Sequence, residues 1–229
     1  MNKLTVTMSK KEVTLGIAYL LLQLIVIPIA LVLVNEVLGA PLSSVEVNYI
    51  FFCLNFLCIT VILHDFLIKS IKHALKHPVR CIVSAFLGLS AYWLLSRAVT
   101  FLIFFIYPEF YNVNDASINQ LMGENLSLVS FGTVVLVPLT EELLYRGLIF
   151  RPLYNKSPLA GYVISTFIFS ALHVVSYIGS YSPLHLALCF LQYLPASICL
   201  GWAYARSDSI WSPVMIHMTI NFIGALSMR

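Results

Sequence analysis

Charged side chains are scarce in this sequence, where Asp, Glu, Lys and Arg make up only 10% of the 229 residues, against about 25% in ordinary soluble domains. Apolar residues reach 60% of the chain, and the mean hydropathy is +0.91. Such a composition excludes a soluble globular domain and a disordered chain alike. The formal net charge of only +3 leaves no basis for binding nucleic acid, which requires clustered and solvated cations.

Cysteine patterns are also lacking. The five cysteines lie in or at the ends of apolar runs, with no CxxC pair and no histidine at zinc-finger spacing. These residues are Cys53, Cys58, Cys81, Cys189 and Cys199. We interpret them as small apolar core residues, which excludes both a disulfide framework and a cysteine metal site.

Long apolar runs, by contrast, are abundant. A helix needs about 20 residues to cross the roughly 30 Å hydrocarbon core of a bilayer. Seven segments are long and apolar enough: 15–38, 45–68, 81–107, 126–150, 158–178, 183–205 and 210–228. The only sizeable connection, 108–125, is polar and acidic and is expected to be a loop. Without repeats or long linkers, the chain is predicted to form one all-α membrane domain over 1–229, a polytopic bundle of about seven transmembrane helices.

Basic residues predict the orientation of this bundle, because cells keep them in the cytoplasmic loops. Most of the 13 Lys and Arg residues fall in connections that would lie on one face. They are Lys3, Lys10, Lys11, Lys69, Lys72, Lys76, Arg80, Arg151, Lys156 and Arg206. The opposite face has only Arg229 together with several acids. The amino terminus is therefore expected in the cytoplasm and the carboxyl terminus outside.

Ionisable residues inside the expected spans are candidates for function, because burying a charge in a membrane is costly. The fourth span contains Glu141, Glu142 and Arg146. Glu142 precedes Arg146 by four residues, the favourable order for an ion pair within one helix. Glu141 points about 100° away from Glu142 around the helix and must find its partners elsewhere.

Those partners are supplied by the fifth and seventh spans. His173 lies in the fifth, while His217 and Asn221 share one face of the seventh because they are four residues apart. All three reach depths comparable to that of Glu141. A carboxylate flanked by two imidazoles and an amide has the groups needed to activate water and stabilise an oxyanion.

A structural interpretation competes with this one. A single buried histidine is more often a hydrogen-bonded structural residue than a catalyst, and Glu142 with Arg146 is more typical of a structural clamp. The combination on three helices favours function, since Ser or Thr could link helices at lower desolvation cost. Two interpretations stay open for Arg97 in the third span: pairing with an acid, or holding a substrate carboxylate.

Three motifs make the chain resemble the CPBP membrane proteases, a family that includes CAAX prenyl endopeptidases and bacterial bacteriocin-processing and self-immunity (Abi) proteins. Glu141-Glu142-x-x-x-Arg146 is similar to the EExxxR motif of the family, Phe169-x-x-x-His173 to FxxxH, and His217-x-x-x-Asn221 to HxxxN. The resemblance covers about residues 125–225, which would form a catalytic core within the membrane domain.

What the resemblance implies is peptide-bond hydrolysis inside the membrane. Glu141 with His173 would activate the water, His217 with Asn221 would bind the oxyanion, and Glu142 with Arg146 would support the site. Zinc held by Glu141, His173 and His217 is an alternative. The metal-free mechanism is favoured because Asn221 beside His217 suits an oxyanion site, whereas zinc proteases usually present HExxH.

The expected partners are membrane lipid and a membrane-associated peptide or protein substrate. The short chain is similar to the bacterial branch of the family, which implies a plasma-membrane enzyme that processes a CAAX-like protein, a peptide pheromone or a bacteriocin leader. A non-enzymatic alternative stays open, in which the protein gives bacteriocin self-immunity or binds a sensor protein. A transporter is disfavoured because broken helices do not recur in two halves of the chain.

Overall fold

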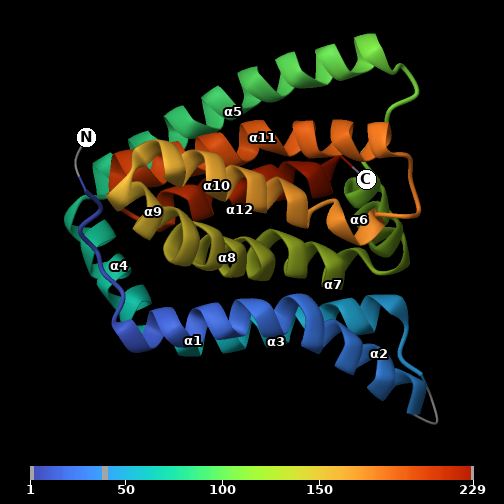
Figure 1. Cartoon of the computed structure of the whole chain (residues 1–229), viewed down its shortest axis with the longest axis horizontal. Helices are drawn as coiled ribbons and strands as arrows, with labels where there is room; N and C mark the ends of the chain where they lie inside the picture. The colour runs from blue at the N-terminus through green and yellow to red at the C-terminus, as the bar shows by residue number, and fades with distance from the viewer. Residues whose placement is uncertain (1–2, 38–40, 228–229) are drawn as a thin grey trace.

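The protein is a bundle of helices (Figure 1). The computed structural model describes residues 3–37 and 41–227. Within these ranges the chain is almost entirely helical and contains no β-sheet. Leu38 and Met228, at which two expected spans end, and Arg229 lie outside the described residues. The all-α prediction is confirmed.

Each of the seven expected apolar segments contains a helix. The first comprises α1 (Lys10–Leu21), η1 (Leu22–Val26) and α2 (Ile27–Val37), and the others are α3 (Ser44–Ile62), α5 (Pro78–Ile106), the continuous segment Leu126–Lys156, α10 (Pro158–Leu172), α11 (Pro183–Ser207) and α12 (Trp211–Leu226). Five of these segments are long and apolar enough to span a membrane, while α10 is a shorter apolar helix of 15 residues. The protein is therefore a multi-pass membrane protein, and the count of seven spans stays a prediction.

The second expected span ends earlier than predicted. The helix breaks at Leu63, which has φ −102° and ψ 25°, so residues 64–68 belong to the separate helix α4 (His64–Lys76). This helix is amphipathic, with three lysines and little apolar character overall, which is unlike a membrane span and typical of a helix at the interface. Figure 1 shows α4 at the same end of the bundle as α9.

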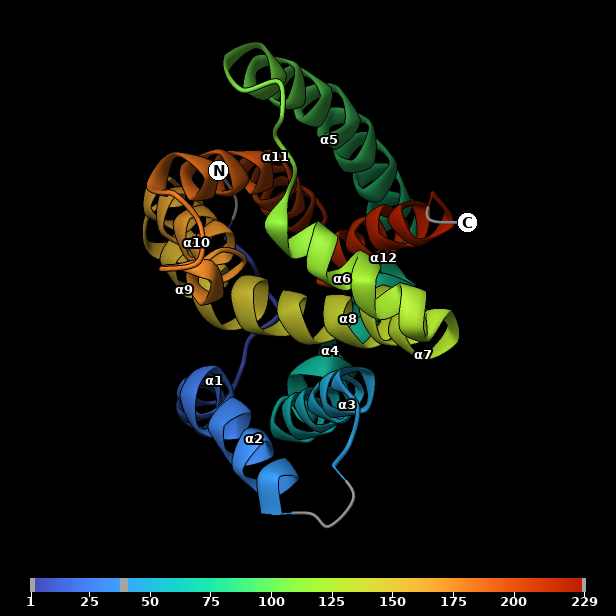
Figure 2. The same cartoon turned by 90° about the vertical axis from the view of Figure 1, so that its right-hand side faces the viewer.

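The predicted loop at 108–125 is wrong, because its greater part forms helix α6 (Val113–Glu124). Asn112 caps this helix by accepting hydrogen bonds from the backbone N–H groups of Asn114 and Asp115. Asp115 lies in the first turn, where a carboxylate interacts favourably with the helix dipole. Figure 2 shows α6 lying across the end of the bundle in front of α8 and α12.

The segment from Leu126 to Lys156 has irregular helical winding. It comprises α7 (Leu126–Phe131), the π-helix η2 (Gly132–Leu136), α8 (Val137–Glu141), the π-helix η3 (Glu142–Phe150) and α9 (Arg151–Lys156). In η2 the N–H of Val137 donates to Gly132 instead of Thr133, and Pro138 has no N–H to offer. The carbonyl of Thr133 therefore lacks a helical partner. Such π-bulges are frequent at functional sites.

The helices form two groups. Figures 1 and 2 show α1, α2 and α3 side by side, next to a larger group of α7 to α12, against which α1 packs through η3 and α3 packs through η2 and α8. In the larger group α11 packs against α5, α10 and α12. Close packing of α10 on α9 requires glycine at Gly161, because a Cβ there would lie 2.8 Å from the backbone nitrogen of Tyr154. This contact sets the position of α10, which leads into His173.

An extended arm precedes α1 and connects distant parts of the chain. The Leu4 N–H donates to Asn155 Oδ1 at 2.8 Å, and the Asn155 amide donates back to the Leu4 carbonyl at 3.1 Å. The Thr5 N–H donates to Asp208 Oδ1 at 2.9 Å. Asp208 ends α11 in the left-handed conformation, with φ 56°. The arm thus fastens the start of the described chain to helices α9 and α11.

Candidate active site

Glu142 and Arg146 form the predicted ion pair within η3. Arg146 Nε lies 3.1 Å from Glu142 Oε2, and both side chains are fully buried. The Arg146 guanidinium also lies over the ring of Phe169, 4.5 Å from its centroid, and donates to the Ser197 carbonyl at 3.3 Å. Contacts to α10 and α11 therefore hold the buried cation, in addition to its partner in the same helix.

Glu141 meets the two histidines predicted to face it. His173 Nε2 and His217 Nε2 each lie 3.9 Å from the same carboxylate oxygen, Glu141 Oε2. This oxygen is buried and has no hydrogen-bond partner. The residues come from the end of α8, the end of α10 and the middle of α12. The structure thus brings together residues that lie up to 76 positions apart in the sequence.

The hydrogen bonds of the two imidazoles indicate their tautomers. His173 Nδ1 lies 2.7 Å from the Phe169 carbonyl, which can only accept, so this nitrogen carries a proton. His217 Nδ1 lies 2.8 Å from Glu142 Oε1 and donates to that carboxylate. Both Nε2 atoms are left to face Glu141. The contact from Glu142 to His217 was not predicted from the sequence, which suggested only the pairing of Glu142 with Arg146.

Asn221 lies beside this cluster on the same face of α12 as His217. Its Nδ2 donates a hydrogen bond of 2.8 Å to the Thr133 carbonyl, the one left without a helical partner by the π-bulge and Pro138. An amide nitrogen has two N–H donors, so the second remains for another acceptor. The irregular winding of η2 therefore orients Asn221.

A cavity of about 650 Å³ contains the cluster. Glu141, His173, His217 and Asn221 all line it, together with apolar and aromatic residues of α3, α5, α11 and α12 and polar residues of α6. The volume suits a short peptide segment, because ligand cavities of about 300 to 1,000 Å³ hold drug-sized molecules. All four predicted catalytic residues thus face one space.

Asp115 and Tyr193 are cavity residues that sequence reasoning missed. The Tyr193 hydroxyl donates to Asp115 Oδ1 at 3.1 Å, and the Tyr193 ring lies over that of His173 with centroids 4.3 Å apart. Burial raises the pKa of the Asp115 carboxyl above its usual value, while the Tyr193 hydroxyl and His173 act in the opposite direction. The available signal for Asp115 was its position shortly after Asn112, a residue type that commonly caps helices, within the segment predicted to be a loop.

Other residues considered in the sequence lie away from the cluster. Arg97 is exposed on α5 and does not line the cavity. Arg146 is buried behind Glu142. Neither arginine is in a position to hold a substrate carboxylate in the cavity. The five cysteines are free thiols, as expected.

The three possible zinc ligands are too far apart for a tetrahedral site as they stand. Two ligands at about 2.0 to 2.1 Å from zinc lie about 3.3 Å from each other, whereas Glu141 Oε2 is 3.9 Å from each Nε2. Across residues 3–37 and 41–227, no group of three His, Cys, Asp or Glu side chains is arranged to hold a metal ion.

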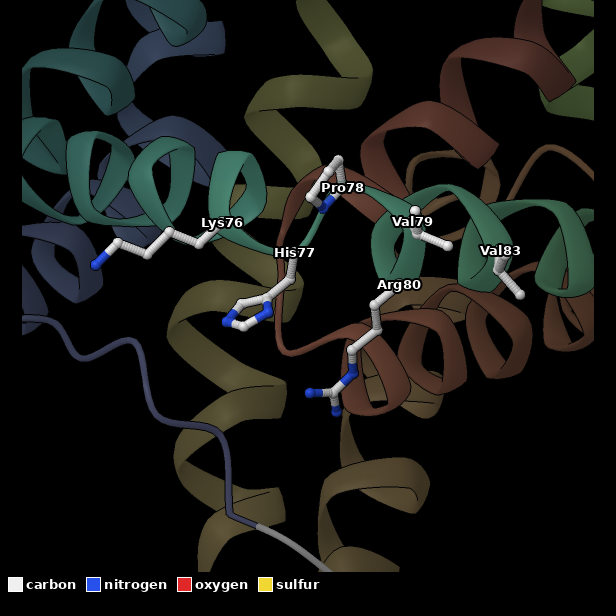
Figure 3. A pocket seen from close by; sticks show the side chains of 6 residues that line it. All are labelled: Lys76, His77, Pro78, Val79, Arg80 and Val83. Atoms are coloured by element: carbon white, nitrogen blue, oxygen red, sulfur yellow. The ribbon is translucent and has the colours of Figure 1, made fainter.

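A second hollow lies at the junction of α4 and α5, and its lining residues are far from Glu141, His173 and His217 in the sequence. Figure 3 shows the residues that line it: Lys76 and His77 at the end of α4, and Pro78, Val79, Arg80 and Val83 at the start of α5. Arg80 Nε donates to the Arg206 carbonyl at 2.7 Å. Cations next to exposed valines are typical of the boundary between headgroups and acyl chains.

Comparison with known proteins is consistent with this geometry. Residues 123–223 match the family described as type II CAAX prenyl endopeptidase Rce1-like. The chain is also similar to the UPF0177 protein YxdF of Lactococcus lactis subsp. lactis (strain IL1403), with 26% identity over 95 residues. That alignment covers 42% of this chain and 47% of the relative, so it spans about half the length of the curated protein. No solved structure matches the chain significantly.

Proposed function

Because residues 123–223 match the family of Rce1-like type II CAAX prenyl endopeptidases, we propose that this multi-pass membrane protein is an intramembrane endopeptidase. One observation carries the proposal. Two imidazole Nε2 atoms converge on one unpartnered carboxylate oxygen of Glu141, inside a cavity among apolar helices. A buried charge without a bonded partner is costly, and activating water supplies a reason for keeping it.

Glu141 is the proposed general base. At 3.9 Å the carboxylate oxygen and His173 Nε2 are too far apart for a direct hydrogen bond. A water molecule at about 2.8 Å from both atoms fits between them. Glu141 takes one proton of this water, and the resulting hydroxide attacks the carbonyl carbon of the scissile peptide bond. The same proton then passes to the leaving amine nitrogen as the C–N bond breaks.

His217 and Asn221 are the proposed oxyanion site. The Glu142 carboxylate accepts from His217 Nδ1 and fixes the ring so that Nε2 faces the cavity, and in the doubly protonated ring this Nε2–H donates to the developing oxyanion. The second N–H of Asn221 is the other donor. Glu142 is thus a positioning residue for His217, and Arg146 in turn holds Glu142. Preorganised donors of this kind commonly contribute about 10²- to 10³-fold to the rate.

The proposed mechanism uses no metal. The wide spacing of Glu141, His173 and His217, the possible zinc ligands, supports this proposal, as does the amide of Asn221 beside His217. The proposed substrate is a membrane-associated peptide or protein that reaches the cavity from the bilayer. The bacterial relative supports a bacterial plasma membrane as the site of action. Whether the substrate is CAAX-like, a pheromone or a bacteriocin leader depends on contacts beyond these catalytic groups.

The test is cleavage of a fluorogenic library of apolar peptides by purified protein in liposomes. We expect turnover by the wild type and a loss of at least 10³-fold in Glu141→Gln, which keeps the shape of the side chain but removes the base. Arg97→Gln, an exposed change on α5, is the matched control and should keep wild-type turnover.

Three outcomes would contradict parts of the proposal. Turnover that survives Glu141→Gln would remove Glu141 from the mechanism. Stoichiometric zinc in active protein, with activity lost to chelators, would replace the metal-free mechanism by the zinc alternative. Peptides that bind without being cleaved would favour the non-enzymatic immunity or sensor-binding role.

A further inference from the structure

The cavity carries an excess of negative charge. Glu141 and Asp115 both line it, and no Lys or Arg is among its lining residues in the described part of the chain. The nearest buried arginine, Arg146, is already neutralised by Glu142 at 3.1 Å. Apart from the two histidines, the cavity therefore offers no cationic side chain to a ligand.

Asp115 belongs to a polar wall of the cavity that also contains the catalytic cluster. Its Oδ1 accepts from the Tyr193 hydroxyl, and Oδ2 makes no hydrogen bond to any of the described residues. Asn114 Nδ2 donates to the same Tyr193 oxygen at 3.1 Å, and Asn112 Nδ2 donates to Gln192 Oε1 at 2.8 Å. These bonds join α6 to α11 and hold Asp115 in place. The carboxylate is fixed by its neighbours and remains open toward the cavity.

The surroundings of Asp115 favour binding of a cation. The Asp115 side chain is exposed in the wall of a cavity formed among apolar helices, where the attraction between opposite charges is screened less than at an open surface. An approaching carboxylate would instead be repelled by two acidic residues, Asp115 and Glu141, with no Lys or Arg among the described lining residues to balance them. Charge selection of this kind is a common basis of specificity.

We propose that Asp115 is a specificity residue that selects substrates with a Lys or Arg side chain on the α6 side of the scissile bond. This inference rests on the proposed function and names the substrate class of the same site. The cation pairs with Asp115 Oδ2, Tyr193 holds the carboxylate, and the peptide backbone between cation and scissile bond passes His173.

The experiment compares three peptides that differ at one position, carrying Lys, norleucine or Glu on an otherwise identical apolar sequence, with the position moved along the peptide. Norleucine keeps the aliphatic length of lysine without the charge. At one position we expect wild-type kcat/KM for Lys to exceed that for norleucine by at least tenfold, with Glu the poorest. Asp115→Asn should bring the ratio of Lys to norleucine close to one, and Asp115→Lys should make Glu the best substrate.

Asp65→Asn is the matched control, because Asp65 is an exposed carboxylate on α4 and carries the same charge away from the cavity. It should leave the ratio unchanged. The inference is overturned if wild type cleaves Lys and norleucine peptides equally at every position, or if Asp115→Asn leaves the Lys preference intact.

Binding of the same labelled peptides, measured by fluorescence anisotropy in nanodiscs, distinguishes failure of the proposed protease activity from failure of the proposed role of Asp115. The protein could bind Lys peptides selectively, lose this selectivity in Asp115→Asn, and cleave none of the peptides. That result would refute the proposed protease activity and support Asp115 as the residue that selects the cation. Cleavage without any charge preference would keep the protease and refute the role of Asp115. Neither binding nor cleavage of any peptide would refute both.

Discussion

Arg146 is the residue whose loss we expect to affect stability most. Replacing it with Ala strands the buried Glu142 charge and removes the contact with Phe169, and breaking such a buried pair costs about 3 to 5 kcal/mol. Glu142 also orients His217, so activity should fall together with stability. Thermal unfolding and peptide turnover, measured in one detergent, test this expectation.

Two further variants complete that comparison. Arg97→Ala removes the same type of side chain from an exposed position and should leave the melting temperature unchanged. Glu141→Ala should abolish turnover yet melt at the wild-type temperature or slightly above it, because it removes a buried oxygen that has no partner. An Arg146→Ala protein that is inactive but as stable as wild type would refute the clamp.

Glu141, His173 and His217 could be predicted as site candidates because the sequence itself shows that they would be costly to bury. Glu141, His173 and His217 interrupt apolar helices, and an unpaired charge there needs an explanation. Asp115 gave no comparable signal, since an acid in a polar connection is ordinary. Its proposed role arises from the fold, which brings it into a hydrogen bond with Tyr193, 78 residues later in the chain. Residues made important only by tertiary contact could not be found from spacing.

At the scale of elements, the long fourth segment was predictable as a helix but not in its winding. Hydropathy gives the same signal for an α-helix and for one interrupted by π-turns. Pro138 has no N–H, so it leaves one carbonyl of this segment without a helical partner. That this carbonyl, at Thr133, accepts from the amide of Asn221 on another helix appears only in three dimensions. Likewise, 108–125 was expected to be a loop because it is polar, although its capping residue permits a helix.

Helix α6 offers a prediction at this scale. Asn112→Ala removes its N-terminal cap and the hydrogen bond to Gln192, and losing a cap costs about 1 kcal/mol. We expect backbone amides of 113–124 to exchange hydrogen about fivefold faster, which hydrogen–deuterium exchange with mass spectrometry can measure.

The control is Asn48→Ala, a half-buried asparagine on α3 that donates only to the carbonyl of Ser44 in its own helix. It should leave exchange in α6 at the wild-type rate. Unchanged exchange in Asn112→Ala would mean that packing on α11, rather than the cap, holds α6.

For the whole molecule, the positions of loops agree with the orientation expected from basic residues. Figure 1 shows α4 and α9 at one end of the bundle and α6 at the other. In a cysteine-free protein, a cysteine at Glu109 should react with a membrane-impermeant maleimide in intact cells. One at Lys72 should react only after permeabilisation, because the lysine-rich end is expected to face the cytoplasm. The reverse pattern of labelling would invert the predicted topology.

The extended arm before α1 has a consequence for biosynthesis. Thr5 bonds to Asp208, 203 residues later, and Leu4 to Asn155. At about 5 to 20 residues per second, the ribosome needs roughly 10 to 40 s to make the partners of Thr5 after Thr5 itself. During that interval the arm has no binding site. Fastening of the arm is therefore a late event, because Thr5 can bond to Asp208 only once α11 has been inserted and Asp208 at its end has been made.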